Sequence, residues 1–126
     1  MFANSKAFSG FAVKDLAAAK DFYQGILGLD VTEVDPDNGL LSLHIAGGRD
    51  VLVYRKPDHQ PASFTILNFP TDDIERDVDA LAAKGVRFER YDGMQQDDKG
   101  INRGGGPLIA WFTDPSGNIL SVLEDA

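Results

Sequence analysis

Short apolar runs alternate with polar turns along the chain, and one stretch near the N-terminus has helical spacing. Asp15 precedes that stretch as a typical N-cap, because its carboxylate accepts hydrogen bonds from the free N–H groups of a first turn. Gly28 follows the stretch, as glycine often does after a helix. The pattern predicts a helix between these two residues. Its apolar positions, three or four residues apart, are Leu16, Ala19, Phe22, Tyr23 and Ile26.

Strands are predicted on both sides of this helix. Turn-forming residues at 35–39 and at Gly47 and Gly48 separate short apolar runs from one another. The first half of the chain therefore has the predicted order strand, helix and three strands. These strands are expected at 8–13, 29–34, 40–46 and 51–54.

The second half repeats this order after a connector at 56–62 that contains two prolines. A helix is predicted to begin after Asp73 and to end before Gly85, with apolar residues gathered on one face. A long polar loop is expected at 92–106 and a tight turn at 114–118. The predicted strands of this half are 63–69, 86–89, 108–112 and 119–123.

The two halves align at a fixed offset. Asp15 corresponds to Asp73, a shift of 58 residues (73 − 15), within the matching segments 11–16 and 69–74. A fixed internal period constrains the fold strongly. We predict one domain, 1–126, of the α+β class, built from two tandem βαβββ modules that form a cupped mixed sheet around a shared cleft, with the helices outside. The modules are expected at about 6–56 and 62–124.

Composition excludes several classes of protein. The 126 residues include 20 acidic and 12 basic ones, for a net charge of −8, which disfavours nucleic acid as a partner. The chain has no run of about 20 apolar residues and no signal-peptide pattern, so we expect no membrane span and a cytoplasmic location. The absence of cysteine excludes disulfides, thiolate metal ligands and a cysteine nucleophile. With only His44 and His59, a multi-histidine metal site is hard to build.

Several segments resemble one known family, in its order and at its spacing. Val-Lys-Asp-Leu at 13–16, Phe-Tyr at 22–23 and Leu-Gly-Leu at 27–29 resemble the opening of the vicinal oxygen chelate superfamily. That superfamily includes glyoxalase I, bleomycin resistance proteins and extradiol dioxygenases. Asp-Pro-Ser-Gly-Asn at 114–118 resembles its Asp-Pro-x-Gly-Asn signature, and Asp-Ile at 73–74 with Ala-Lys-Gly-Val at 83–86 resembles the helix of its second module. The resemblance covers about residues 6–124 and implies two βαβββ modules around a small-molecule site.

In metal-dependent members of this superfamily, His, Gln or Glu ligands come from the first and last strands of both modules. The resemblance places three of these positions at Phe8, Ile66 and Ser121, and the fourth at Leu52 or Tyr54. Phenylalanine and isoleucine cannot coordinate a divalent cation, and serine, leucine and tyrosine are poor substitutes for imidazole and carboxylate. We therefore expect the scaffold of the superfamily without a metal ion or other cofactor.

The predicted ligand-binding residues are side chains that strand alternation turns toward the cleft, together with one arginine of the 92–106 loop. Arg103 is a candidate contact for an anion, and Trp111 either packs in the core or stacks on a ligand. The glycine-rich loop itself is interpreted as a lid or as a plain connecting loop. The full predicted set is Phe8, Leu52, Tyr54, Ile66, Asn68, Arg103, Trp111 and Ser121.

His44 lies in the middle of a predicted strand and has two interpretations. In the first it is structural, either a partly exposed strand residue or one that caps a neighbouring carbonyl, and in the second it is a ligand or base. No nucleophile motif such as Gly-x-Ser-x-Gly accompanies either histidine, so Ser-His-Asp catalysis is not predicted.

These observations predict a metal-free small-molecule-binding protein of the glyoxalase/bleomycin resistance type, which sequesters an antibiotic or metabolite. The alternative is a metal-dependent lyase, isomerase or dioxygenase with displaced ligands (His44, Tyr54, Glu124), or a metal-free catalyst with Tyr54 or His44 as acid or base. A third interpretation is a scaffold that dimerises or regulates, and the resemblance implies a homodimer. The net charge favours a cationic or neutral ligand over an anionic one.

Overall fold

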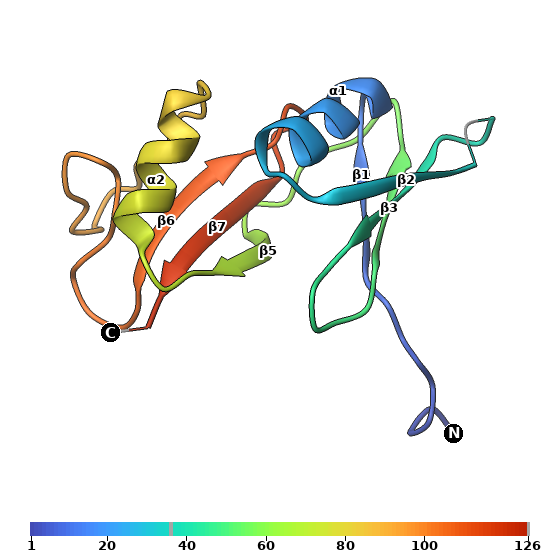
Figure 1. Cartoon of the computed structure of the whole chain (residues 1–126), viewed down its shortest axis with the longest axis horizontal. Coiled ribbons are helices and arrows are strands. Elements are labelled where there is room, and N and C mark those ends of the chain that lie inside the picture. The colour runs from blue at the N-terminus through green and yellow to red at the C-terminus, as the bar shows by residue number, and fades with distance from the viewer. Residues whose placement is uncertain (36, 126) are drawn as a thin grey trace. The chain divides into compact units, whose positions relative to one another are not determined.

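The computed structural model describes residues 1–35 and 37–125. They form two compact units, Met1–Gln60 and Pro61–Ala126, joined within the connector expected at 56–62. Each unit contains one sheet with a helical segment packed on one of its faces (Figure 1). Among the described residues, no helix is long and apolar enough to cross a membrane.

The first unit has the predicted order of strand, helix and three strands. Its sheet has the strand order β1-β4-β3-β2, in which β1 runs parallel to β4 and the other pairs are antiparallel. The elements are β1 (Gly10–Val13), α1 (Leu16–Lys20), η1 (Asp21–Ile26), β2 (Asp30–Asp35), β3 (Leu40–His44) and β4 (Val51–Arg55).

The predicted first helix is confirmed, although its second half, η1, is π-helical. Asp15 caps it as expected, because its carboxylate accepts a hydrogen bond from the Ala18 N–H at 3.0 Å. The turn then widens, and the Leu27 N–H bonds to the carbonyl of Phe22, five residues back, at 3.0 Å. Gly28 leaves the helix with φ 74°, a left-handed conformation that glycine adopts without strain.

The core of the first unit lies between this helical segment and the sheet. Tyr23 is fully buried, and its ring lies 5.7 Å from that of Phe11. The buried residues of β3 and β4 are all odd-numbered, for example Leu41 and Val53, both with no exposed surface. Because side chains alternate along a strand, the even-numbered residues lie on the opposite face, which we call the open face of the first sheet.

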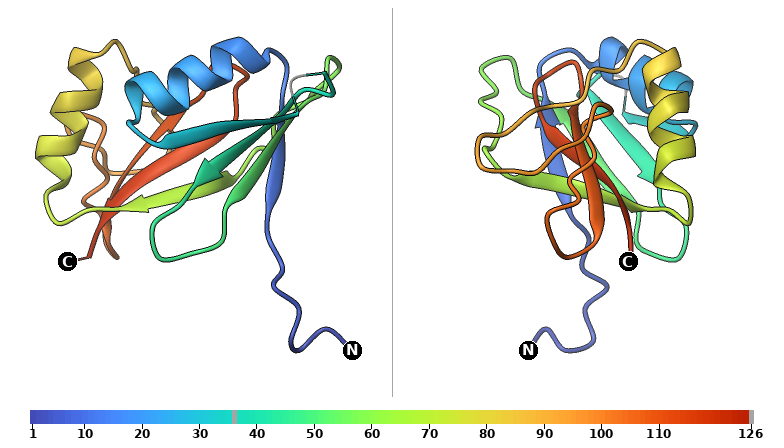
Figure 2. Two further views of the ribbon diagram at one scale, coloured as in Figure 1. Left: turned by 45° about the vertical axis from the view of Figure 1, so that its right-hand side comes forward. Right: turned by 90° about the vertical axis from the view of Figure 1, so that its left-hand side faces the viewer.

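The second unit repeats the plan with one strand fewer than predicted. Its sheet has the order β5-β7-β6, with β5 parallel and β6 antiparallel to β7 (Figure 2). The strand expected at 86–89 is wrong: the segment forms only an isolated bridge from Phe88 to Phe112 and a bond from the Glu89 N–H to the Trp111 carbonyl. The elements are β5 (Thr65–Pro70), α2 (Ile74–Ala83), β6 (Leu108–Thr113) and β7 (Ile119–Glu124).

The 92–106 loop contributes one side chain, that of Ile101, to the core of the second unit. Ile101 is fully buried in a cluster with Ile74, Val78, Ala110 and Val122. This anchoring favours the interpretation as a connecting loop over that as a lid, because opening the loop would expose a core side chain.

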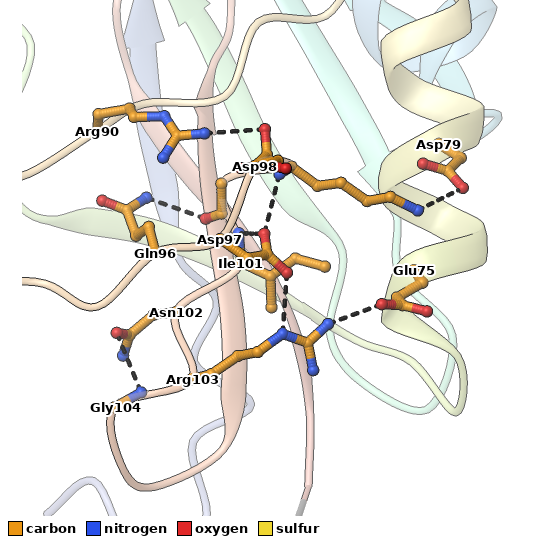
Figure 3. A network of polar contacts seen from close by, with 12 residues as sticks. Glu75, Asp79, Arg90, Gln96, Asp97, Asp98, Ile101, Asn102, Arg103 and Gly104 are labelled. Carbon is orange, nitrogen blue, oxygen red and sulfur yellow. Dashed lines mark hydrogen bonds and ion pairs between the residues drawn. The ribbon is translucent and has the colours of Figure 1, made fainter.

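Polar bonds hold the same loop in place. The Gln96 amide donates to the carbonyls of Glu89 and Gly100. The Arg90 guanidinium donates to the carbonyl of Asp98 (Figure 3). These bonds satisfy backbone carbonyl groups in and just before the loop that have no partner strand.

Candidate functional site

The open face of the first sheet carries a row of directly paired residues. Thr32 on β2 pairs with Ser42 on β3, which pairs with Leu52 on β4. Directly paired residues of neighbouring strands share a face, with their Cβ atoms about 5 Å apart. A hydroxyl, a second hydroxyl and an apolar side chain therefore stand side by side on this face.

A cavity of about 310 Å³ opens on this face, and we call it the first-sheet hollow. Two of its large apolar side chains are exposed to solvent, Phe8 by 61% and Val34 by 55%. Its volume is at the lower end of the range for small-molecule sites. The lining residues are Phe8, Val34, Ser42, Gly48, Arg49, Asp50 and Leu52.

The hollow also has a charged rim. Within residues 1–35 and 37–125, Arg49 makes no hydrogen bond or ion pair, so its guanidinium is available to a ligand. Asp50 is engaged, since its carboxylate lies 3.0 Å from Nδ1 of His44. One cation and one hydrogen-bonded carboxylate thus border an apolar surface.

His44 connects two residues that sequence reasoning missed. Its Nε2 lies 2.7 Å from the Thr32 hydroxyl, and its Nδ1 is bonded to Asp50. The turn predicted at 35–39 indicates that the strands beside it pair as a hairpin. The proximity of Thr32 and His44 could have been predicted from that hairpin. The position of Asp50 has no comparable signal, because it depends on how the following turn folds back.

The hollow contains two of the predicted site residues, Phe8 and Leu52. Tyr54 lies two residues beyond Leu52 on the same face of β4 and is 39% exposed, but it does not line the hollow. Phe8 precedes β1 instead of lying within it, since the strand begins at Gly10.

In the second unit, three predicted residues form a row across the sheet. Ser121 on β7 pairs with Asn68 on β5 and with Trp111 on β6. Its buried hydroxyl donates to Oδ1 of Asn68 at 2.5 Å, so these two polar groups partner each other. Trp111 packs edge-on against Tyr91, with ring centroids 5.3 Å apart. Burial, and then the charge of Glu89, raises the pKa of the Tyr91 phenol.

Ile66 falls at an irregularity of β5. The pairing of β5 with β7 shifts register between Thr65 and Leu67. A bulge of this kind breaks the alternation of side chains, so the face of Ile66 does not follow by counting from Asn68.

Arg103 is bound by two carboxylates of its own unit (Figure 3). Its Nε donates to Asp97 at 2.9 Å and its Nη2 to Glu75 at 2.7 Å. The hydrogen bond to Asp97 is the main cause of a raised pKa of Arg103, which favours the charged form. Its charge is thus neutralised locally, and an anionic ligand would have to compete with both carboxylates.

The donor set does not fit the metal ion that the resemblance implies. Phe8, Ile66 and Leu52 offer no lone pair, and the hydroxyl of Ser121 is engaged with Asn68. Two of the three alternative ligands are engaged as well: both ring nitrogens of His44 have partners, and Glu124 accepts from the Ile74 N–H at 3.3 Å. In the described part of the chain, no three His, Asp or Glu side chains are grouped as a metal site would require.

Solved structures with the same fold span nearly the whole chain. TnmS3, an antibiotic binding protein from Streptomyces sp. CB03234, has a TM-score of 0.69 and 24% identity, covering 98% of each chain. The glyoxalase family protein from Enterococcus faecalis has a TM-score of 0.67 and 22% identity, covering 98% of this chain and 100% of that chain. The fosfomycin resistance protein FosX from Listeria monocytogenes has a TM-score of 0.71 and 16% identity, covering 95% of this chain and 92% of that chain.

Sequence comparison assigns the family. No curated protein sequence matches the chain significantly. The family model of the Glyoxalase/Bleomycin resistance protein/Dioxygenase superfamily, however, matches residues 7–122. Together with the α+β fold of two tandem modules, this match shows that the chain belongs to the Glyoxalase/Bleomycin resistance protein/Dioxygenase superfamily.

Proposed function

We propose that this protein binds a small organic molecule, without a metal ion, in the first-sheet hollow. The observation that carries the proposal is the exposure of Phe8 and Val34 beside Leu52 in a cavity of about 310 Å³. When a ligand covers large apolar side chains that face water in a concave site, the free energy of the system falls, which favours binding. The antibiotic binding protein and the fosfomycin resistance protein with this fold support an antibiotic or related metabolite as the ligand.

The lining of the hollow indicates the chemistry of this ligand. Phe8, Val34 and Leu52 favour an apolar or aromatic ring, while Ser42 and Arg49 offer hydrogen-bond donors at the rim. The net charge of −8 disfavours a strongly anionic molecule at long range. An uncharged ring system with a carbonyl or hydroxyl group fits both features.

Replacing Phe8 by glutamine is expected to weaken binding of N-phenyl-1-naphthylamine, an uncharged fluorescent probe, by about tenfold. The loss corresponds to part of the contact area that a phenyl ring supplies, about 1.4 kcal/mol. A fluorescence titration measures it. Treatment with a chelator is expected to leave the affinity unchanged, because the proposed site uses no metal.

Phe64→Gln provides the matched control. Phe64 is a similarly exposed phenylalanine, at 67%, but it belongs to the second unit and does not line the hollow. This variant is expected to bind the probe as the wild type does. Equal weakening by both substitutions, or loss of binding on chelation, would contradict the proposed site.

The proposal includes a cytoplasmic homodimer. Phe2 of the first unit is 77% exposed, which is consistent with a surface that a second copy covers in part. Light scattering after size exclusion is expected to give twice the chain mass of 13.7 kDa at micromolar concentration. A mass of one chain under those conditions would reject the dimer and leave the binding proposal standing.

A further inference from the structure

The contacts of His44 determine which of its nitrogens carries the proton when the ring is neutral. Nδ1 lies 3.0 Å from a carboxylate oxygen of Asp50, and an ionised carboxylate only accepts hydrogen bonds. The proton therefore belongs on Nδ1, and Nε2 presents a lone pair. Since Nε2 is 2.7 Å from the Thr32 oxygen, the threonine hydroxyl must be the donor in that bond.

This arrangement is that of an activated nucleophile. A hydroxyl donates to Nε2 of an imidazole, and a carboxylate on Nδ1 orients the ring and stabilises its protonated form. Thr32 is exposed, so its oxygen is accessible to a ligand. The three residues come from β2, from the end of β3 and from the turn before β4.

Thr32 also lies next to the first-sheet hollow. Its cross-strand partner Ser42 lines the hollow, and so does Asp50. Arg49 is in the same lining without an ion-pair partner among the described residues, and a positive charge stabilises a developing oxyanion. A carbonyl group of a ligand in the hollow would thus meet both a nucleophile and a cation.

We propose that Thr32, His44 and Asp50 form a hydrolytic triad that cleaves an ester of an apolar carboxylic acid held in the first-sheet hollow. This inference rests on the proposed function, because the ligand occupies the same hollow.

The reaction needs only the ester and water. The Thr32 oxygen attacks the ester carbonyl carbon and forms a C–O bond while its proton passes to Nε2 of His44. The C–O bond to the alcohol breaks, and the departing alkoxide takes that proton. Water then attacks the acyl-threonine and gives a proton to His44, and the Thr32 oxygen recovers it as the carboxylic acid leaves.

The test uses p-nitrophenyl butyrate as the ester and phenylmethylsulfonyl fluoride as a label for activated hydroxyls. Thr32→Val keeps the β-branched shape of the side chain, and it is expected to lower nitrophenol release at least about 100-fold. Thr113→Val, a strand threonine of the second unit, is the control and is expected to keep the wild-type rate. Mass spectrometry is expected to find one sulfonyl adduct, on Thr32, and none in His44→Gln. An unlabelled Thr32, or equal rates for wild type and Thr32→Val, would overturn the triad.

Asp50 acts as a positioning residue that orients the ring of His44. Its test separates an effect on this orientation from an effect on folding. Asp50→Asn is expected to slow labelling of Thr32 without shifting the unfolding midpoint, and Asp50→Glu is expected to restore labelling in part. Slower labelling accompanied by a lower midpoint in Asp50→Asn, with no rescue by glutamate, would count against the triad.

Failure of the triad and failure of the proposed function give different results. Binding of N-phenyl-1-naphthylamine that depends on Phe8, with Thr32 unlabelled, would leave a binding protein and reject the triad. Labelled Thr32 without probe binding would support the triad and reject the hollow as the binding site.

Discussion

Replacing Asp114 by alanine is expected to lower the free energy of unfolding by about 3 kcal/mol. The side chain is buried in the turn of the Asp-Pro-Ser-Gly-Asn segment. Its carboxylate accepts from the N–H groups of Ser116 and Asn118, at 2.9 and 3.0 Å, and from the Asn118 amide at 2.9 Å. Because Asn118 is only 2% exposed, water cannot readily replace the lost acceptor, and buried donors would remain unsatisfied.

The chain contains a matched control for this substitution. Asp35 makes two of these three kinds of bond, since it accepts from the N–H of Asn38 at 3.2 Å and from the side-chain amide of Asn38 at 2.6 Å. Asn38 is exposed, so water can take over as the acceptor in Asp35→Ala, and a much smaller loss is expected. The two variants are compared by urea unfolding, in which a change of the midpoint at an unchanged slope (m value) reports a change in the free energy of unfolding. An equal loss of unfolding free energy in both variants would show that burial does not explain the stabilisation by Asp114.

Replacing Asp97 by asparagine is expected to lower the free energy of unfolding at pH 7 by about 2 kcal/mol. Asp97 accepts three hydrogen bonds, each of 2.9 Å, from Nε of Arg103 and from the N–H groups of Lys99 and Ile101. These bonds hold the loop in the geometry that places Ile101 in the core. An asparagine keeps one accepting oxygen. In place of the other oxygen it has an NH₂ group, which is a donor and therefore cannot accept the hydrogen bond that this oxygen accepted.

The effect of this substitution is expected to depend on pH. Burial alone would raise the pKa of Asp97, but the hydrogen bond from Arg103 and those from Ile101 and Lys99 together hold that pKa below its ordinary value. The stabilisation is therefore fully present above the unfolded-state pKa, about 3.9, and is lost as pH falls through the lower folded-state pKa. Urea titrations between pH 7 and pH 3 are expected to show the gap between wild type and Asp97→Asn closing below about pH 4.

Asp98→Asn is the control for Asp97→Asn. It removes the same charge from the same loop, but among residues 1–35 and 37–125 Asp98 is bonded through its backbone carbonyl, which accepts from Arg90, and not through its carboxylate. It is expected to change stability little, with little dependence on pH. A gap of the same size and pH dependence in both variants would assign the effect to net charge instead of to the hydrogen bonds of Asp97.

The helices, the turns and the internal repeat could be predicted from the sequence. Asp15 and Asp73 were identified as caps because capping is local: a carboxylate reaches N–H groups only three residues ahead, and the structure shows bonds to Ala18 and Arg76. The Asp-Pro-Ser-Gly-Asn turn is local for the same reason, since its bonds join residues two to four positions apart. Such features depend on spacing along the chain, which one sequence displays in full.

Strand register and long-range packing could not be predicted from the sequence, because they depend on contacts between distant segments. Residues 86–89 have the pattern of a strand, but they find a sheet partner only at Phe88. The face of Ile66 does not follow from strand alternation, because a register shift interrupts β5 between Thr65 and Leu67, and no local residue pattern indicates that shift. Ile101, in a loop that its composition marks as polar, became a core residue because Asp97 turns the chain there toward α2 and the sheet.

The site shows the same division. Phe8 and Leu52 were expected from the sequence because apolar residues stood where the resemblance places metal ligands, and both line the hollow. The contact of Thr32, His44 and Asp50 emerged only in the folded unit, because three segments must reach one point on the sheet with side chains on the same face. Local periodicity sets which way each side chain points, whereas the pairing of strands and the path of the turns set which side chains meet.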